Sequence, residues 1–359
     1  MNDEGQNAIH KTLIIRFSSV GDVLLSSLLC RVLRNRFPES TIDFVVKSEY
    51  ADLVRHNPHL NHVVEFPPGA GQGELLRLRR TILASRYDLI IDIHDSLRSR
   101  ILCLGNNNVV RINKRKLARF LLVRTKQNFY SSLDGSTSIA LRYLETVASY
   151  GVQDDGQGLE VHVPEDARKK VEELLPDSKA SSFIGLCPSA RHATKIWLQG
   201  RFAETAVELA RRASCNIILF GSGDEIDRCS AIEELIRKQE SSVSVSNMAG
   251  KISLLETAAA MDFCRVVISN DSGLMHLAAA RKRPVVAIFG STVRELGFFP
   301  FGTRNTVVEN MNVECRPCSH IGRAACPKGH FRCMQDIQST QVIEAASSYL
   351  KLNKSTNER

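Results

Sequence analysis

The sequence contains no stretch of about eighteen uninterrupted apolar residues, so no transmembrane helix is expected. Its first residues, MNDEGQNAIHK, are polar and lack the apolar core of a signal peptide, so we expect no export. Short-period repeats and low-complexity tracts are also absent, which argues against a repeat architecture. A chain of 359 residues that is 43% hydrophobic and 24% charged predicts a soluble protein of about two globular domains.

Two common nucleotide-binding motifs are missing from the first strand-to-helix loop. This loop has neither the P-loop pattern GxxxxGKS/T nor the dinucleotide pattern GxGxxG. No nucleic-acid-binding motif or platform of stacking aromatic residues is recognisable either, so nucleic acid is not expected as a partner. The net charge of +8 still favours anionic partners, such as phosphates, acidic sugars or a lipid surface.

Strand patterns alternate with helical periodicity along almost the whole chain. This alternation predicts an α/β fold, with parallel sheets covered by helices on both faces. We predict strands at residues 12–17, 41–46, 62–66, 87–93, 109–112, 182–188, 216–221, 265–270 and 284–290. We predict helices at residues 21–37, 73–85, 201–213, 224–238, 253–261 and 273–283.

The alternation lapses at residues 148–166, where Gly, Asp and Gln cluster. We therefore predict two doubly wound domains, 1–160 and 161–359, whose strands present their carboxyl ends to a shared central cleft. The last helix could pack back on the N-terminal domain.

The first predicted loop, in SSVGDVLLSS, raises a question about Asp22. This residue stands in the first helical turn, where the helix dipole favours an ionised carboxylate. Asp22 could simply cap the helix, or it could act on a ligand at the carboxyl edge of the sheet. Gly21 would let a ligand or another backbone segment approach closely.

Two loops in the second half contain groups that suit an anionic ligand. SARHATKIW offers the hydroxyls of Ser189 and Thr194 with the ammonium of Lys195, although it could equally be a solvated basic loop. SNDSGLMHLAAA follows a strand and opens a helix, so its first N–H groups could bind an anion or could be capped by the preceding polar residues. The polar positions of this turn and of the nearby Gly-rich turn are Asp271, Ser272, Gly273, His276 and Glu225.

These stretches together resemble the ADP-heptose:lipopolysaccharide heptosyltransferases, glycosyltransferase family 9. The resemblance also covers YDLIIDIHDSLRSRILC and CRPCSHIGRAACPKGHFRCMQDI and runs from about residue 11 to residue 350. It implies a GT-B fold of two Rossmann-like domains, with the acceptor on the N-terminal domain and the ADP-sugar on the C-terminal domain. It also implies inversion at the anomeric carbon without an essential catalytic metal.

The resemblance further implies roles for individual residues. Asp22 would be the general base, and Lys195 with the turn at 271–273 would stabilise the departing ADP. Glu225 and Ile252 fall near positions that contact the nucleoside. The remaining donor-site residues would be Ser189, Thr194 and His276, and the acceptor-site residues would be Ser19, Gly21, Arg98, Lys114 and Arg115.

The sequence departs from the family pattern at the acceptor side. His94 and Asp95 replace a frequent Gln-Gly pair, and Ser138 replaces a frequent histidine. The basic run at 111–126 interleaves Lys and Arg with Leu and Phe. That run is either a solvated amphipathic helix or a contact with lipid A phosphates or an anionic membrane leaflet. The resemblance implies a cytoplasmic enzyme, peripheral to the inner membrane of a Gram-negative bacterium.

The chain has ten cysteines, and we expect reduced thiols because no export signal is visible. Six are scattered along the chain, among them Cys30, Cys187 and Cys264, and we expect these six to be small core residues. The other four are close in sequence and could hold a structural zinc ion, stay reduced, or form a disulfide after purification. They are Cys315, Cys318, Cys326 and Cys333.

We therefore expect a heptosyltransferase that acts on an inner-core lipopolysaccharide acceptor such as Kdo-lipid A. The partners would be an ADP-sugar donor, an anionic lipid-linked saccharide and the membrane surface. The alternatives are a transferase of the same family with another nucleotide sugar, a nucleotide-sugar epimerase of the same fold, and a nucleotide-sugar-binding protein without turnover.

Overall fold

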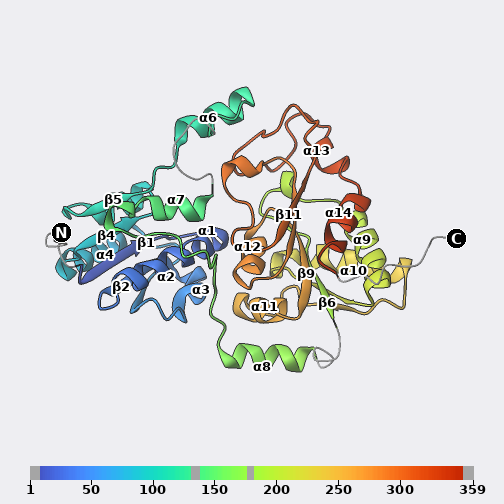
Figure 1. Ribbon diagram of the computed structural model, residues 1–359, viewed down its shortest axis with the longest axis horizontal. Helices are drawn as coiled ribbons and strands as arrows, with labels where there is room; N and C mark the ends of the chain where they lie inside the picture. Colours follow the sequence, from blue (N-terminus) through green and yellow to red (C-terminus); the bar gives the residue numbers. More distant parts are fainter. Residues whose placement is uncertain (1–8, 131–137, 176–181, 351–359) are drawn as a thin grey trace. The chain divides into compact units, whose positions relative to one another are not determined.

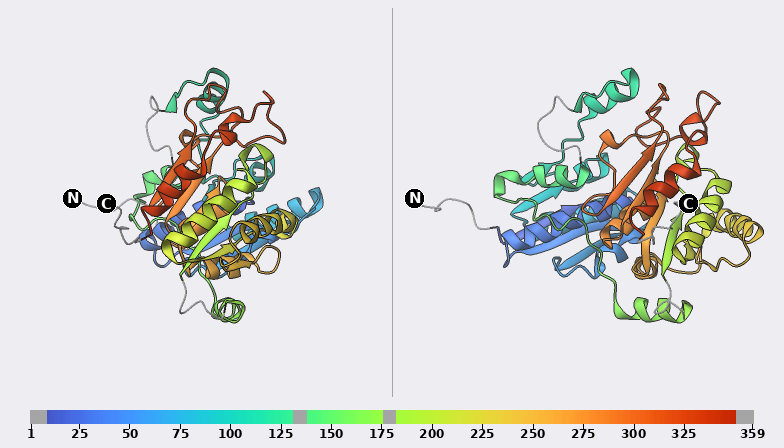
Figure 2. Two further views of the ribbon diagram at one scale, coloured as in Figure 1. Left: turned by 90° about the vertical axis from the view of Figure 1, so that its right-hand side faces the viewer. Right: turned by 45° about the vertical axis from the view of Figure 1, so that its right-hand side comes forward.

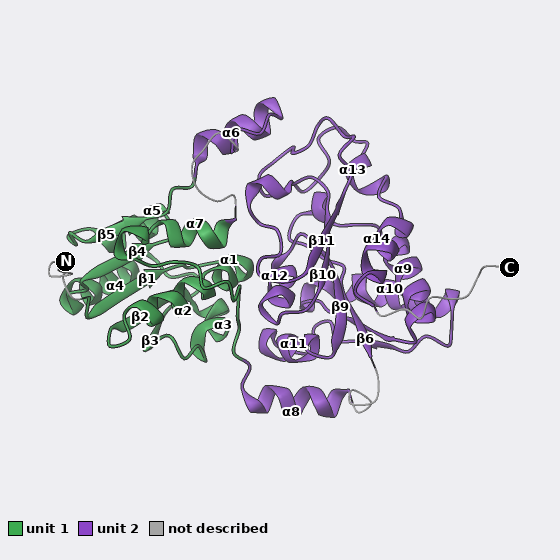
Figure 3. Cartoon of the chain, viewed as in Figure 1, with its two compact units in different colours: residues 1–114, 139–162 green, residues 115–138, 163–359 purple. Residues whose placement is uncertain are grey.

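A computed structural model describes residues 9–130, 138–175 and 182–350 of the chain. The chain forms two compact units: unit 1 comprises residues 1–114 and 139–162, and unit 2 comprises residues 115–138 and 163–359 (Figure 3). The segment 115–138 thus groups with unit 2, which a single boundary near residue 160 does not anticipate. No helix in the described ranges is both long and apolar enough to cross a membrane.

Unit 1 contains a five-stranded sheet in the order β3-β2-β1-β4-β5, and every neighbouring pair is parallel. Each strand matches a predicted apolar segment to within two residues at either end. The chain order reverses between β1 and β4, which is the switch point where ligands bind in such sheets. The strands are β1 (Lys11–Ile15), β2 (Thr41–Lys47), β3 (His62–Phe66), β4 (Leu89–Asp92) and β5 (Val109–Arg111).

Helices cover both faces of this sheet (Figure 1). They are α1 (Val20–Leu25), α2 (Ser27–Arg36), α3 (Asp52–Arg55), α4 (Gln72–Ser85), α5 (Leu97–Cys103) and α7 (Ile139–Glu145). Leu13 and Ile15 of β1 pack with Leu78 of α4 and Leu102 of α5, all of them buried. Burial of each such side chain contributes about 1.5–3 kcal/mol to folding and so stabilises the packing of α4 and α5 on the sheet.

The predicted helix 21–37 forms two helices, α1 and α2, which are separated at Ser26. The Ser26 hydroxyl donates to the carbonyl of Val23 at 2.6 Å, and the Ser27 hydroxyl donates to the carbonyl of Leu24 at 2.7 Å. Serine side chains that bond to the backbone in this way compete with the regular helical pattern. Asp22 lies in the first turn of the short α1, which begins at the carboxyl ends of the strands.

Unit 2 contains a six-stranded parallel sheet in the order β11-β10-β9-β6-β7-β8, which reverses between β6 and β9. β8 and β11 were not predicted, because they are edge strands with half-buried residues and lack a continuous apolar run. The strands are β6 (Phe183–Cys187), β7 (Asn216–Leu219), β8 (Val245–Asn247), β9 (Cys264–Asn270), β10 (Val285–Phe289) and β11 (Asn305–Glu309).

The helices of unit 2 include α9, whose Phe202, Ala206, Leu209 and Ala210 are buried at helical spacing. The last described helix, α14, lies beside α9 and also contacts β10 of unit 2 (Figure 2). The helices are α6 (Lys116–Thr125), α8 (Glu165–Leu174), α9 (Gln199–Ala213), α10 (Ile226–Gln239), α11 (Leu254–Met261), α12 (Gly273–Ala280), α13 (Arg332–Gln335) and α14 (Ser339–Ser347).

Candidate functional site

A carboxylate lies in the loop that follows β1. Oδ1 of Asp22 pairs with Nη2 of Arg16 at 2.5 Å, and the Tyr143 hydroxyl lies 3.5 Å from the same oxygen. Oδ2 accepts hydrogen bonds from the Ser19 amide at 3.2 Å and from its hydroxyl at 3.0 Å. Asp22 therefore does cap α1 through Oδ2, and its side chain is 17% exposed.

The surroundings of Asp22 keep it ionised. Burial alone would raise its pKa, but the Arg16 guanidinium and the Ser19 hydrogen bonds outweigh burial and hold the pKa below its ordinary value. Arg16 is fixed in turn, since it donates to the carbonyls of Ser18 at 2.9 Å and Ile93 at 2.7 Å. The result is a preorganised anion at the switch point of the first sheet.

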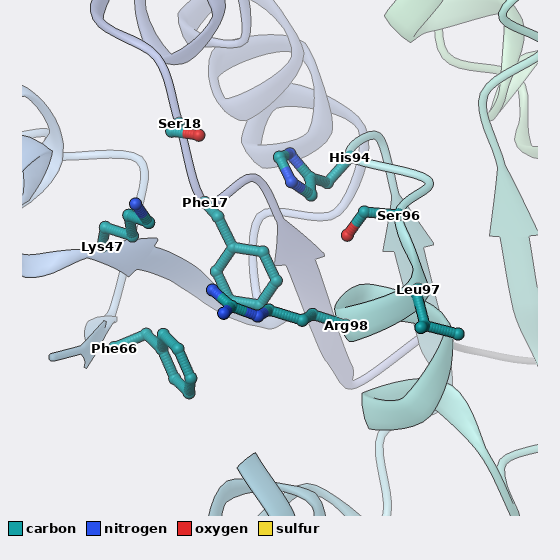
Figure 4. Close-up of a pocket in the computed structure, with 8 residues that line it drawn as sticks. All are labelled: Phe17, Ser18, Lys47, Phe66, His94, Ser96, Leu97 and Arg98. Atoms are coloured by element: carbon teal, nitrogen blue, oxygen red, sulfur yellow. The ribbon is translucent and has the colours of Figure 1, made fainter. Parts of the chain in front are cut away.

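A cavity of about 410 Å³ opens in unit 1 next to this loop. Its lining side chains follow the carboxyl ends of four neighbouring strands. They are Phe17, Ser18, Lys47, Phe66, His94, Ser96, Leu97 and Arg98. Figure 4 shows Lys47 and Phe66 on one side of Phe17, and His94 and Ser96 on the other. Phe17 contacts the rings of Phe66 and His94, with centroids 5.3 and 5.1 Å apart.

The cavity combines cations with apolar walls. Lys47 and Arg98 supply positive charge, whereas His94 is neutral because burial lowers its pKa to about 3. Hydroxyl and ammonium donors beside aromatic rings suit a polyhydroxylated ligand that carries negative charge. Of the predicted acceptor residues, Arg98 lines this cavity, and Ser19 and Gly21 lie in the adjacent loop.

Two other predicted acceptor residues have structural contacts. Lys114 donates to the carbonyl of Asp95 at 3.0 Å, and Asp95 also pairs with Arg100 at 2.7 Å. Arg115 is buried and has the left-handed backbone conformation from which α6 begins, with φ of 46°. Ser138, the position where relatives often have histidine, is also buried.

In unit 2, three neighbouring strands bring an ion pair and a hydroxyl together. Lys195 follows β6, and its ammonium lies 2.7 Å from Oδ2 of Asp271, which follows β9. The hydroxyl of Thr292, after β10, donates to that same oxygen at 2.6 Å. Both charged side chains are nearly buried, at 14% and 6% exposure, so their orientation is well fixed.

The predicted loop 188–197 is held by hydroxyl groups. Thr194 accepts hydrogen bonds from Ser291 at 2.9 Å and from the amide of Arg323 at 2.8 Å. The Ser189 hydroxyl is buried and has no hydrogen-bond partner among the described residues. A buried hydroxyl left in this way is available to a ligand.

The remaining predicted donor residues lie after the carboxyl ends of β7, β8 and β9. Ser272 is the N-cap residue of α12, and Gly273 is the first residue of that helix. His276 is only 3% exposed, on the buried side of α12. Glu225 accepts a hydrogen bond from the Ser222 amide at 2.8 Å as part of a capping box. Ile252 is half-buried, just before α11.

α6 has one packed face and one exposed face. Ala118 and Leu122 are buried and pack with Leu296 in unit 2. On the opposite face, Leu117 and Phe120 are 71% and 63% exposed. Lys116 and Arg124 are exposed on that same face, so α6 presents cations beside apolar side chains.

The four clustered cysteines do not gather at metal-binding distance. Within the described ranges, the only group of three or more histidine, cysteine or carboxylate side chains whose ligand atoms all lie within 4.8 Å of one another contains none of these cysteines. Sγ of Cys315 lies 3.7 Å from Nε2 of His330, and burial raises the pKa of Cys333 to about 11. Of the three alternatives for these cysteines, a zinc ion therefore finds no formed four-sulfur site in the described residues.

The fold and both sites can now be compared with known proteins. A family model described as glycosyltransferase family 9 (heptosyltransferase) matches residues 75–328. The chain belongs to glycosyltransferase family 9. It is 28% identical over 291 residues to lipopolysaccharide heptosyltransferase 2 of Salmonella typhimurium, covering 78% of this chain and 82% of that protein.

Two solved structures share the fold. The family 9 glycosyltransferase of Veillonella parvula has a TM-score of 0.77 at 20% identity, covering 97% of this chain and 99% of that one. The structure of E. coli ADP-heptose lps heptosyltransferase II has a TM-score of 0.69 at 24% identity, covering 95% and 98%. With the two parallel sheets, these similarities confirm the predicted GT-B fold.

Several residues around these family 9 sites escaped the sequence analysis. Arg16, Lys47 and Phe66 belong to predicted strands or their ends, and Tyr143 lies outside every motif quoted above. Thr292 follows the predicted strand 284–290 and lies outside the motifs quoted above. The only available signal was position, because each except Tyr143 lies at or next to the carboxyl end of a parallel strand.

Proposed function

We propose that this family 9 enzyme transfers a heptose from ADP-heptose to the inner core of lipopolysaccharide with inversion. The observation that carries the proposal is that each sheet holds a fixed charged group at the carboxyl ends of its strands. Unit 1 has the ionised Asp22, and unit 2 has the Lys195–Asp271–Thr292 cluster. The proposed substrates are supported by similar proteins, since the E. coli structure is named for ADP-heptose and the Salmonella protein for lipopolysaccharide. Unit 1 would bind the acceptor, and unit 2 the donor.

In the proposed reaction, Asp22 acts as general base. The acceptor hydroxyl oxygen forms a bond to the anomeric carbon, and the bond from that carbon to ADP breaks with its electron pair. The hydroxyl proton passes to Asp22. Because its pKa is low, Asp22 is a weak base that accepts the proton late, once the attacking oxygen has become acidic.

The leaving ADP needs positive charge, which unit 2 can supply without a metal ion in the mechanism. Lys195 would contact the diphosphate, and the first N–H groups of α12 with Ser272 would add donors. Asp271 holds Lys195 in place and could bind sugar hydroxyls through its other oxygen, while Thr292 fixes the carboxylate. Ser189 and Thr194 complete the proposed donor site, with Glu225 and Ile252 toward the nucleoside.

The cavity of unit 1 suits the acceptor. Lys47 and Arg98 would pair with the negative charges of an acidic core sugar, while Phe17 and Phe66 would contact its apolar face. Arg98 is exposed and Leu97 beside it is 76% exposed, so both can meet a ligand that extends beyond the cavity.

The exposed face of α6 would contact the membrane that carries this acceptor. Leu117 and Phe120 would enter the headgroup region, and Lys116 and Arg124 would pair with anionic lipid phosphates. The enzyme would then act as a peripheral protein on the cytoplasmic face of the inner membrane of a Gram-negative bacterium.

The decisive experiment is turnover of Asp22→Asn with ADP-heptose and Kdo-lipid A or its heptosylated product, followed by mass spectrometry. Loss of the general base should lower kcat by about 10²–10⁴-fold. The exposed Asp52→Asn on α3 is the matched control and should retain activity. Near wild-type turnover in Asp22→Asn would contradict the assignment of Asp22 as the general base. Product only with another nucleotide sugar would move the enzyme to a different donor, and donor binding without any product would favour a binding protein.

A further inference from the structure

Two histidines and a glutamate meet in unit 1 in a group separate from the residues assigned above. His59 lies in the loop between α3 and β3. Glu160 and His162 lie in the extended segment at the end of unit 1, about one hundred residues later in the chain. Their ligand atoms all lie within 4.8 Å of one another, and no other such group occurs in the part of the chain that the structure describes.

The distances match those of a metal-ligand set. Nε2 of His59 lies 3.2 Å from Oε1 of Glu160, and Nε2 of His162 lies 3.5 Å from the same oxygen. A tetrahedral ion with bonds of about 2.0–2.2 Å holds its ligand atoms about 3.3–3.6 Å apart. The two imidazole rings have centroids 6.1 Å apart and planes inclined by 72°, and one nitrogen of each lies within 3.5 Å of the same carboxylate oxygen.

Two of these atoms are removed from solvent without adequate compensation. Oε1 of Glu160 and Nε2 of His162 are buried, and neither has a hydrogen bond of acceptable geometry among the described residues. A buried polar atom left so costs about 1–3 kcal/mol. A cation placed between them would satisfy both atoms at once.

The neighbouring residues orient the carboxylate. Arg31 donates to Oε2 of Glu160 at 2.8 Å, which leaves Oε1 facing the histidines. Asp155 binds Arg31 through both oxygens, at 2.6 and 2.8 Å, and so offsets the positive charge of Arg31. An outer partner that fixes a ligating carboxylate in this way is common in metal sites.

We propose that His59, Glu160 and His162 form a binding site for a divalent transition metal, with Zn²⁺ the expected ion. Two imidazoles and one carboxylate suit Zn²⁺, Co²⁺ or Ni²⁺ better than Mg²⁺ or Ca²⁺, which prefer oxygen ligands. The ion would tie the extended segment at the end of unit 1 to the loop before β3. Its role would be structural, because none of the proposed base, donor or acceptor residues belongs to the group.

The test is titration of the full-length, metal-free protein with Co²⁺, followed by visible absorption. Wild type should bind one Co²⁺ with d–d bands but without the near-ultraviolet sulfur-to-cobalt band of a cysteine site. His59→Asn and His162→Asn should each weaken binding by about tenfold or more, while the exposed His56→Asn, on the same loop as His59, should not. Zn²⁺ should raise the melting temperature of wild type and of His56→Asn only.

Either of two results would overturn the proposal. One is the absence of detectable Co²⁺ binding by the wild type, or Co²⁺ binding by both His59→Asn and His162→Asn that equals that of the wild type. The other is a sulfur-to-cobalt band that disappears in Cys315→Ser, which would place the ion at the cysteines. Because the readouts are metal binding and melting temperature, they do not depend on the proposed transferase reaction.

Discussion

Unit 1 and unit 2 place their polar side chains at equivalent points of similar sheets but use opposite charges. In unit 1 the switch between β1 and β4 holds a carboxylate, Asp22, that is fixed by a guanidinium. In unit 2 the switch between β6 and β9 holds an ammonium, Lys195, that is fixed by a carboxylate. Sheet topology therefore creates the location, and the side chains decide whether it presents a carboxylate or an ammonium group.

The surroundings differ as well. Unit 1 adds an aromatic-walled cavity with cations at its sides, whereas unit 2 adds hydroxyls and helix N–H groups. The first environment suits a large acidic saccharide and the second suits a diphosphate. If this division of labour holds, substitutions in the two units should change different kinetic parameters.

Within unit 2, the largest effect should come from Lys195→Ala. Loss of the ammonium that faces the leaving diphosphate should lower kcat by about 10²–10³-fold. Steady-state kinetics with ADP-heptose measure this, and the exposed Lys251→Ala in the same unit serves as control. A loss confined to acceptor KM would break the comparison, because unit 2 would then not act on the leaving group.

A substitution in unit 1 should instead change the pH profile. Arg16→Met removes the charge that lowers the pKa of Asp22, so burial should raise that pKa and move the acid limb of kcat/KM to higher pH. Arg16→Lys keeps the charge and should shift the limb less. An unmoved limb in Arg16→Met, with folding verified by circular dichroism, would place the base elsewhere.

The same pair predicts a pH dependence of stability. The pKa of Asp22 is lower in the folded state, so the pair stabilises the protein above the ordinary Asp range. This contribution should disappear as pH falls through the folded-state pKa. Denaturant melts of wild type and Asp22→Asn should therefore differ at neutral pH and converge in acid, and a constant difference would contradict this linkage.

A smaller effect is expected at the cavity of unit 1. Arg98→Ala should raise the KM for the acceptor about tenfold, equal to about 1.4 kcal/mol, with little change in kcat. Arg77→Ala, an exposed arginine of α4, is the control. If the KM for ADP-heptose rose instead, the cavity would belong to the donor and the two units would not divide the substrates as proposed.

The smallest effect concerns the membrane surface of α6. Phe120→Ser should weaken binding to phosphatidylglycerol vesicles several-fold, by up to about tenfold, since one exposed aromatic side chain no longer enters the lipid. Turnover of a soluble, delipidated acceptor should not change. Leu174→Ser on α8 removes another exposed apolar side chain, 43% exposed, and should bind vesicles like wild type. Equal binding by all three proteins would exclude α6 as the contact.

Most strand segments could be predicted because buried parallel strands such as Val285–Phe289 are continuous apolar runs. Asp22 and Lys195 could be singled out because each follows such a run within a motif of family 9. The edge strand Val245–Asn247 could not, because half-buried residues leave no distinct pattern. The sequence also did not predict that Lys47 and Phe66 line the cavity, since this depends on which strands become neighbours.

The amino-acid sequence alone determined the α/β class, the alternation of elements and the positions of polar residues after buried strands, because these follow from local periodicity. Only the tertiary structure decided which of those residues meet. Sheet order places Lys195, Asp271 and Thr292 in contact although nearly one hundred residues separate the first from the last. The group of His59, Glu160 and His162 is of the same kind, because its spacing arises from chain packing and from no sequence motif.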